Sequence, residues 1–274
     1  MLQPFVLREC LAQLCPQWAW SEIHNITFLS GGYSNHNYRL RYRDTDFVLR
    51  VPGVRQPFVD RVHEARWYER LPVGLSARLV ALDQASGAML TEWIDGQLLA
   101  DLPSVEDQAL LEFLERLHTA LPHTSREYRV EDIFPLQPTA GADMPAELPS
   151  QLNLNNLTTC HNDLNPWNVM IDKHDNWVTL DWEFVGRNDP LFDLICLHQG
   201  LARSDLSLLP LCATYLKAPE DDLDLRVQMS LQTFWMRELG WAQYQISHGN
   251  ERREVVDQVH QASRELQRLA ANTG

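Results

Sequence analysis

One short stretch in the second half of the chain constrains its fold more than any other feature. Residues 161–168 read HNDLNPWN, which has the form His-x-Asp-x-x-x-x-Asn. The stretch lies between two segments, 157–160 and 169–172, whose short apolar runs are typical of strands. A third such segment, 177–181, ends on Asp181, thirteen residues after the stretch. We therefore expect one loop between strands to present a carboxylate and an amide, with a second carboxylate at a strand end.

These side chains are the ones that phosphoryl transfer to an alcohol requires. A carboxylate must orient the acceptor hydroxyl, and magnesium ions that bridge phosphate oxygens need hard oxygen ligands. An isolated His-x-Asp pair is more often structural than catalytic, whereas the full stretch followed by a strand-ending aspartate is much more specific. The pattern therefore predicts Asp163 as the catalytic base and Asn168 with Asp181 as magnesium ligands.

The stretch and the segment Asp181-Trp182-Glu183 resemble the catalytic loop and the metal-binding aspartate of the kinase-like small-molecule phosphotransferases. That superfamily contains aminoglycoside phosphotransferases, choline and ethanolamine kinases, and bacterial thiamine kinase. The Asp-Trp-Glu variant is most similar to the choline and thiamine kinase branch. The resemblance implies an α+β, bilobal protein-kinase-like fold. Residues 1–93 would form an N-terminal, nucleotide-binding lobe with an antiparallel sheet and a helix, and residues 94–274 a mostly helical C-terminal lobe with the catalytic loop and the acceptor site.

The apolar periodicity and the turn residues along the chain agree with this order of elements. Residues 122–156 contain five prolines and read as an irregular connection, where many members of the superfamily carry a longer helical insert. The acceptor is therefore less constrained than the chemistry. Strands are predicted at 26–30, 35–42, 47–51, 77–82 and 88–93, and helices at 5–18, 57–71, 104–121 and 224–248 and elsewhere after Pro190.

The resemblance also implies where ATP binds. The loop between the first two strands would cover the phosphates, since glycines allow a close approach of the backbone. Arg50 on the third strand would face the phosphates and be oriented by Glu64, although the two could also be unrelated surface charges. The backbone of residues 91–95 would bind the adenine, with Met89 as a wall. The nucleotide-binding residues predicted in this way are Gly31, Gly32, Ser34, Asn35, Arg50, Glu64, Glu92, Trp93 and Ile94.

The predicted helix 224–248 carries several aromatic residues and is similar to the helix that choline and thiamine kinases place beside the acceptor. Aromatic faces attract a permanent cation, but an aromatic stripe at helical spacing is also typical of a core. Glu183 could assist a second magnesium ion or face solvent, and Asp193 matches a family aspartate that braces the catalytic loop. The residues predicted to contact the acceptor are Trp182, Glu183, Trp235, Trp241 and Tyr244.

Composition excludes some classes of protein. The formal net charge of −14 disfavours a nucleic-acid partner and would attract a cationic substrate, although surplus carboxylates could serve only solubility. The five cysteines are odd in number and include no Cys-x-x-Cys pair, so neither a disulfide framework nor a zinc site is expected. We found neither a secretory signal nor an apolar run long enough to span a membrane, and we expect a cytoplasmic protein.

Together these features predict an ATP- and Mg²⁺-dependent kinase that phosphorylates the hydroxyl of a small, cationic alcohol of the choline or thiamine type. Its partners would be ATP and that alcohol, with no nucleic acid and no membrane. Two alternatives stay open. The same fold could act on ethanolamine, an aminoglycoside or a sugar, or the chain could be a nucleotide-binding module that has lost catalysis.

Overall fold

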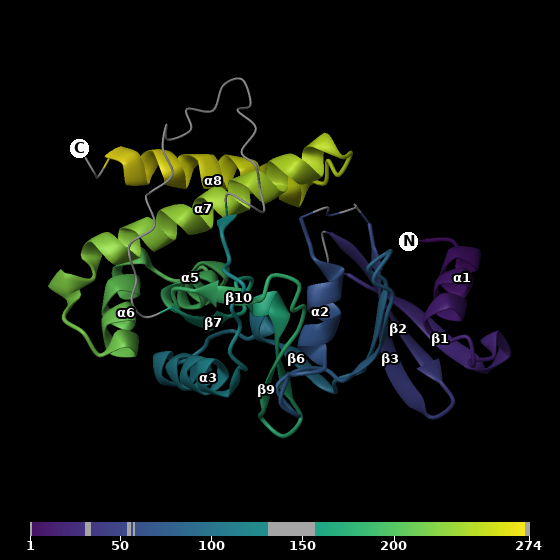
Figure 1. The fold of residues 1–274 in the computed structure, drawn as a ribbon. Helices are drawn as coiled ribbons and strands as arrows, with labels where there is room; N and C mark the ends of the chain where they lie inside the picture. The colour runs from purple at the N-terminus through teal and green to yellow at the C-terminus, as the bar shows by residue number, and fades with distance from the viewer. Residues whose placement is uncertain (1, 31–33, 54–55, 57, 131–156, 272–274) are drawn as a thin grey trace. The chain divides into compact units, whose positions relative to one another are not determined.

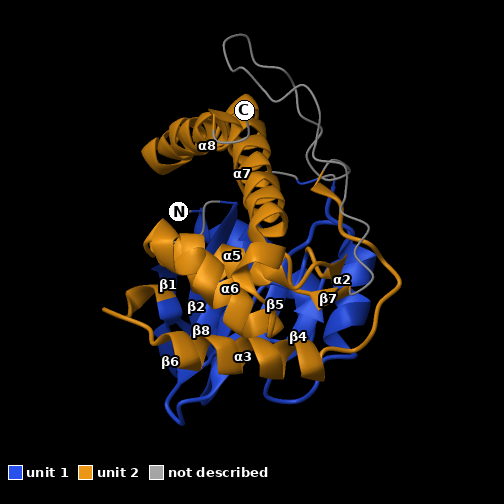
Figure 2. Cartoon of the chain, turned by 90° about the vertical axis from the view of Figure 1, so that its left-hand side faces the viewer, with its two compact units in different colours: residues 1–99, 167–183 blue, residues 100–166, 184–274 orange. Residues whose placement is uncertain are grey.

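The computed structural model describes residues 2–30, 34–53, 56, 58–130 and 157–271 (Figure 1). The predicted phosphate-loop glycines Gly31 and Gly32, and most of the connection 122–156, lie outside the described residues. The chain divides into two compact units, which Figure 2 distinguishes by colour. The first comprises residues 1–99 and 167–183, and the second comprises residues 100–166 and 184–274. The first unit thus contains the whole predicted lobe 1–93 and adds the segment that carries both predicted magnesium ligands.

The first unit is built on a five-stranded antiparallel sheet with the strand order β1-β2-β3-β5-β4. In β2, Tyr38, Leu40 and Tyr42 are buried while the arginines between them are not, which is the period of two that places one face of a strand on a core. Helix α1 contributes Leu7 and Leu11 to the same core. The bounds of these elements are α1 (Pro4–Leu14), β1 (Ile23–Leu29), β2 (Asn35–Tyr42), β3 (Thr45–Pro52), α2 (Arg61–Tyr68), β4 (Leu79–Leu82) and β5 (Met89–Glu92).

A second sheet in the first unit carries the segment 167–183. It has the order β6-β8-β9, with β6 (Gly96–Leu98), β8 (Val169–Asp172) and β9 (Trp177–Thr179). The sequence pattern did not predict β6, because Gly96 reads as a chain breaker. The structure explains this glycine: a Cβ at position 96 would lie 2.2 Å from the carbonyl oxygen of Ile171 on the paired strand. The close approach of the two backbones therefore requires glycine.

The second unit is mostly helical. Helix α5 (Leu191–Gly200) is buried along almost its whole length, and it packs against α7 (Asp224–Ser247), which in turn packs along α8 (Arg253–Ala271) (Figure 1). Helix α7 confirms the predicted helix 224–248. This unit also contains α3 (Asp107–Ala120), α6 (Leu208–Leu216) and the paired strands β7 (Thr158–Cys160) and β10 (Gly186–Asn188).

In the described part of the chain, five short 3-10 helices connect these elements. They are Trp20–Glu22, Leu99–Asp101, Pro166–Asn168, Asp205–Ser207 and Glu220–Asp222. An antiparallel sheet with helices α1 and α2 in the N-terminal part, and a mostly helical C-terminal part, confirm the predicted α+β class. Among the described residues, no helix is long and apolar enough to cross a membrane.

Candidate active site

The predicted base, Asp163, follows a residue whose backbone is fixed in an unusual conformation. Asn162 is completely buried and has a φ of 65°, in the left-handed region that Asn tolerates better than most residues. Its side-chain amide donates to the carbonyl oxygens of Cys160 and Phe184 at 3.1 and 3.0 Å. The amide of Asn188 donates in turn to Asn162 Oδ1 at 2.8 Å. These bonds fix the backbone that leads into Asp163, whose side chain is 23% exposed.

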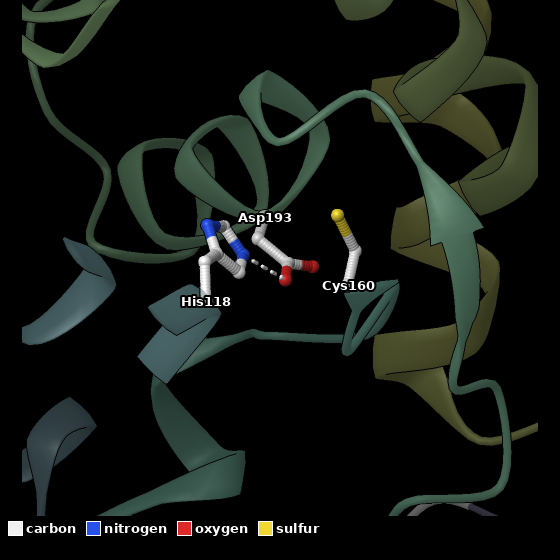
Figure 3. Close-up of side chains that lie close together, drawn as sticks. All are labelled: His118, Cys160 and Asp193. Carbon is white, nitrogen blue, oxygen red and sulfur yellow. Dashed lines mark hydrogen bonds and ion pairs between the residues drawn. The ribbon is translucent and has the colours of Figure 1, made fainter. Parts of the chain in front are cut away.

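Asp193 on α5 braces the same loop, as the resemblance implied. Its two carboxylate oxygens accept hydrogen bonds from the main-chain N–H groups of His161 and Asn162, each at 2.8 Å. His118 on α3 lies 2.9 Å away through Nε2 (Figure 3). Burial raises the pKa of Asp193, but the hydrogen bond and the charge of His118, with further support from His161, outweigh it and lower that pKa. Asp193 is therefore an ionised anchor for the loop.

Cys160 lies beside His118 and Asp193, and the three side chains could be taken for a metal site (Figure 3). Their hydrogen bonds argue against it. The thiol of Cys160 points to the carbonyl oxygens of Thr158 and Asn188 at 3.7 and 3.6 Å, and burial raises the pKa of this thiol well above its usual value. Because the carboxylate is also committed to backbone amides, we interpret the cluster as structural support for the catalytic loop.

Asp163 has a charged neighbour that the sequence did not reveal. Arg237, on the aromatic helix α7, is only 5% exposed, and its Nη1 donates to Asp163 Oδ1 at 2.9 Å and to the carbonyl oxygen of Asn162 at 2.8 Å. Asn165 Nδ2 lies 3.3 Å from the same carboxylate oxygen. The signal that could have drawn attention to Arg237 was the pair of charged residues Arg237-Glu238 between the apolar residues 234–236 and Leu239.

In the first unit, Arg50 makes the predicted pair with Glu64. Arg50 Nη2 lies 2.8 Å from Glu64 Oε1, and Nη1 lies 2.6 Å from Asp181 Oδ1. Arg50 is 4% exposed and Glu64 is completely buried, so the alternative of unrelated surface charges is wrong. Burial alone would lower the pKa of Arg50, but the carboxylates of Glu64 and Asp181 outweigh it and raise the pKa. Arg50 is therefore a fixed cation between two carboxylates.

A second arginine, Arg61 on α2, was not predicted. Its Nη1 lies 2.7 Å from Glu64 Oε2 and 2.8 Å from Glu183 Oε2, so it links the two carboxylates. Glu183 is 5% exposed, and the alternative that it faces solvent is therefore wrong. Burial first and the charge of Asp181 second raise the pKa of Glu183, against the lowering effect of Arg61 and Arg50. This cluster therefore contains three carboxyl groups and two arginines.

This cluster has the ligands that a divalent cation needs. Oxygens of Glu64, Asp181 and Glu183 lie within 4.8 Å of one another, and hard carboxylate oxygens are what Mg²⁺ prefers. Asp181 has a φ of 59°, which lies in the left-handed region. Asn168 belongs to the same unit, and its carbonyl oxygen accepts a bond of 2.8 Å from the N–H of Leu180. The residues present therefore fit a magnesium ion.

Two N–H groups of the predicted adenine-binding segment, those of Glu92 and Trp93, already donate within the protein. The N–H of Glu92 donates to the carbonyl oxygen of Arg78, and the N–H of Trp93 donates to that of Asp46, each at 3.0 Å. Within the described part of the chain, the N–H of Ile94 has no hydrogen-bond acceptor. The side chain of Glu92 pairs with Arg78. A ligand at this edge would therefore be bound through Ile94 rather than through the two residues before it.

The predicted phosphate loop is described only at its end, from Ser34 onward. Asn35, the first residue of β2, is 8% exposed, and its Oδ1 has no hydrogen-bond partner among the described residues. A buried amide oxygen without a hydrogen-bond partner costs free energy, and such atoms are commonly satisfied by a ligand or a water molecule. Asn35 therefore stays a candidate for nucleotide binding.

The predicted acceptor residues fall into two groups. Trp182 is completely buried, its indole N–H donates to Ser76 Oγ at 3.0 Å, and Trp235 is 3% exposed. This burial indicates packing for both tryptophans, the alternative that the sequence left open. Trp241 and Tyr244 are partly exposed, and Tyr244 stacks on His248 with ring centroids 4.0 Å apart. Those two residues keep accessible surface for a ligand.

Comparison with known proteins identifies the family. The chain matches the phosphotransferase enzyme family (APH) over residues 25–225. Protein LicA of Haemophilus influenzae is 27% identical over 216 residues, which cover 69% of this chain and 63% of LicA, so the chain spans less than two thirds of that relative's length.

Solved structures show the same fold. Choline kinase LicA from Streptococcus pneumoniae superposes with a TM-score of 0.71 at 15% identity, over 96% of this chain and 98% of that one. A structure of LicA in complex with AMP gives 0.73 at 18% identity, over 97% and 98%. The family match takes in well over half of the chain, including the stretch 161–168 and Asp181, and this protein therefore belongs to the phosphotransferase enzyme family.

Proposed function

We propose that this protein is an ATP-dependent phosphotransferase that transfers the γ-phosphoryl group to the hydroxyl of a small, cationic alcohol of the choline or thiamine type. The observation that carries the proposal is the cluster of the buried Arg50 and Glu64 with the partly exposed Asp181, all within one unit. A fixed cation beside carboxylates is what nucleotide phosphates and a divalent metal require of a protein. Two similar structures support it, since one is a choline kinase and the other contains AMP.

The first unit would bind the nucleotide. Arg50 would contact the phosphates from between its two carboxylate partners, and the N–H of Ile94 would bind the adenine edge. Asn168 and Asp181 would hold Mg²⁺, which neutralises the charge of the phosphates when bound. Glu64 would keep Arg50 in place, because removing a partner from a buried ion pair leaves an uncompensated charge.

Asp163 would act on the acceptor. Its carboxylate would accept a hydrogen bond from the acceptor hydroxyl and take the proton as the oxygen–phosphorus bond forms and the bond from the γ-phosphorus to the leaving ADP oxygen breaks. Catalysis would come mainly from positioning and charge stabilisation. Trp241 and Tyr244, which are partly exposed, and the net charge of −14 favour a cationic acceptor.

Two other functions remain as alternatives. An aminoglycoside or a sugar could be the acceptor on the same fold, and the irregular connection 122–156 leaves this choice open. A nucleotide-binding module without transfer is less well supported, because Asp163, Asn168 and Asp181 are all present and loss of catalysis usually removes one of them.

A substrate panel separates these possibilities. ADP formation is measured with Mg²⁺–ATP and choline, ethanolamine, thiamine or kanamycin, against a control without acceptor. We expect choline or thiamine to raise the rate most, and the increase to require Mg²⁺. If ATP raises the melting temperature while none of the acceptors raises ADP formation, the inactive module is favoured and the transferase proposal is contradicted.

A further inference from the structure

Arg237, the arginine that contacts the proposed base Asp163, also pairs with the neighbouring Glu238. The Nε of Arg237 donates to Glu238 Oε1 at 2.9 Å, and its Nη2 contacts the same oxygen. Glu238 Oε2 accepts a bond of 2.8 Å from Gln258 Nε2 on α8. One edge of the guanidinium therefore faces the catalytic loop, while the other is fixed by a carboxylate that α8 supports.

The same guanidinium also lies over two aromatic rings. The central carbon of Arg237 lies 5.3 Å from the ring centroid of Phe234 and 5.6 Å from that of Phe192. Both distances are within the range of a cation–π interaction. The cation on this part of the aromatic helix is therefore the protein's own, and Phe234 is not available to a cationic acceptor.

From this geometry we infer that Arg237 is a positioning residue that holds the Asp163 carboxylate in the orientation needed for transfer, with Glu238 fixing Arg237. The inference rests on the proposed function. Arg237 bonds both to the Asp163 side chain and to the carbonyl oxygen of Asn162, so it fixes the carboxylate relative to its own backbone. A planar fork with several donors can do this, whereas the single ammonium of lysine cannot reach all three acceptors in the same geometry.

The charges in this group support the role. Burial lowers the pKa of Arg237, but Glu238, Cys196 and Asp163 outweigh it and raise that pKa well above its usual value, so the guanidinium stays charged. One arginine is shared by the carboxylates of Asp163 and Glu238. A buried charge with this many partners costs free energy to desolvate, and conformational specificity is one reason to keep it.

The test compares variants of Arg237 with a matched control on the same helix. Arg226 lies eleven residues earlier and forms its two bonds of 2.8 Å with Asp189 rather than with Asp163. We expect Arg237→Met to lower kcat by about 10- to 100-fold with the KM for ATP little changed, because a displaced base loses alignment. The kcat of Arg237→Lys should fall less than that of Arg237→Met. Millimolar guanidinium should restore part of the kcat of Arg237→Met. Arg226→Met should lose stability but keep its kcat.

The possible outcomes separate the inference from the proposed function. A wild-type protein that transfers no phosphate to any acceptor contradicts the proposed function, and the inference with it. If the wild type is active and Arg237→Met has the same kcat, only the inference is contradicted. The inference is also contradicted if Arg226→Met loses as much kcat as Arg237→Met, because the effect would then be a general structural one. If Arg237→Met does not fold, Arg237→Lys decides, because it keeps the buried charge: a kcat equal to that of the wild type contradicts the inference.

Discussion

At the scale of single residues, buried ion pairs determine what the candidate site can do. Arg50 and Arg61 connect three carboxylates in the first unit, and Arg237 connects two in the second. Each arginine is at least 90% buried, so these pairs are little screened by solvent. Removing one partner from such a pair is costly, because it leaves an unpaired charge in a medium of low dielectric constant.

Asp193 allows a test by pH. Its pKa is lowered in the folded state, so the stability it contributes is present above the usual value of 3.8 and is lost as the pH falls through the lowered value. Asp193→Asn should lower the free energy of unfolding at pH 7 by about 3–5 kcal/mol, because an amide cannot replace a carboxylate that accepts three hydrogen bonds. Urea denaturation from pH 7 to pH 3 should also show a weaker acid dependence than in the wild type.

The matched control for this change is Asp44→Asn, in an exposed turn. It should leave the stability within about 0.5 kcal/mol of wild type. Unfolding curves of Asp193→Asn that coincide with those of the wild type at every pH would show that Asp193 does not brace the catalytic loop.

The sequence predicts contacts between neighbouring elements better than contacts between distant segments. The Arg50–Glu64 pair was predictable, since a strand and the next helix carry it at a spacing known from the resemblance. Arg237 and Asp163 lie 74 positions apart, and nothing in the local sequence of either reports the contact. Trp182 and Trp235 show the reverse: local pattern suggested a ligand site, whereas both side chains are buried.

At the scale of elements, the apolar pattern predicted the strands β2, β3 and β5 and the helix α7 to within a few residues. The pattern missed β6 and β10, each three residues long. Both strands begin with glycine, which reads as a turn when the partner strand is unknown. Short strands of this kind are fixed by pairing with distant segments rather than by their own composition.

Gly200, the last residue of α5, gives a test at this scale. A Cβ there would lie 2.2 Å from Pro166 Cδ, in the catalytic stretch. Alanine usually stabilises a helix by about 1 kcal/mol relative to glycine, but overpacking of this kind costs about 1–3 kcal/mol. We therefore expect Gly200→Ala to lower both the free energy of unfolding, measured with urea, and kcat. Ser230→Ala on α7 is the control and should change neither, and a more stable Gly200→Ala would refute the close contact.

At the scale of the whole molecule, the residues proposed for nucleotide and metal binding belong to one unit and the proposed base belongs to the other. Arg50, Asn168 and Asp181 belong to the first unit, and Asp163 belongs to the second. The peptide bond between Pro166 and Trp167 joins the two sets within one short stretch. The sequence patterns predicted the residues that we propose for the reaction. They did not predict that residues 167–183 belong to the first unit, because this depends on the pairing of the sheet β6-β8-β9.

The most direct test of the account is phosphorus NMR of a reaction with Mg²⁺–ATP and the best acceptor of the panel. We expect one phosphomonoester of the acceptor for each ADP formed, and a rate that falls by about 100-fold or more in Asp163→Ala. Inorganic phosphate as the only product, or an undiminished rate of ester formation in Asp163→Ala, would contradict the account.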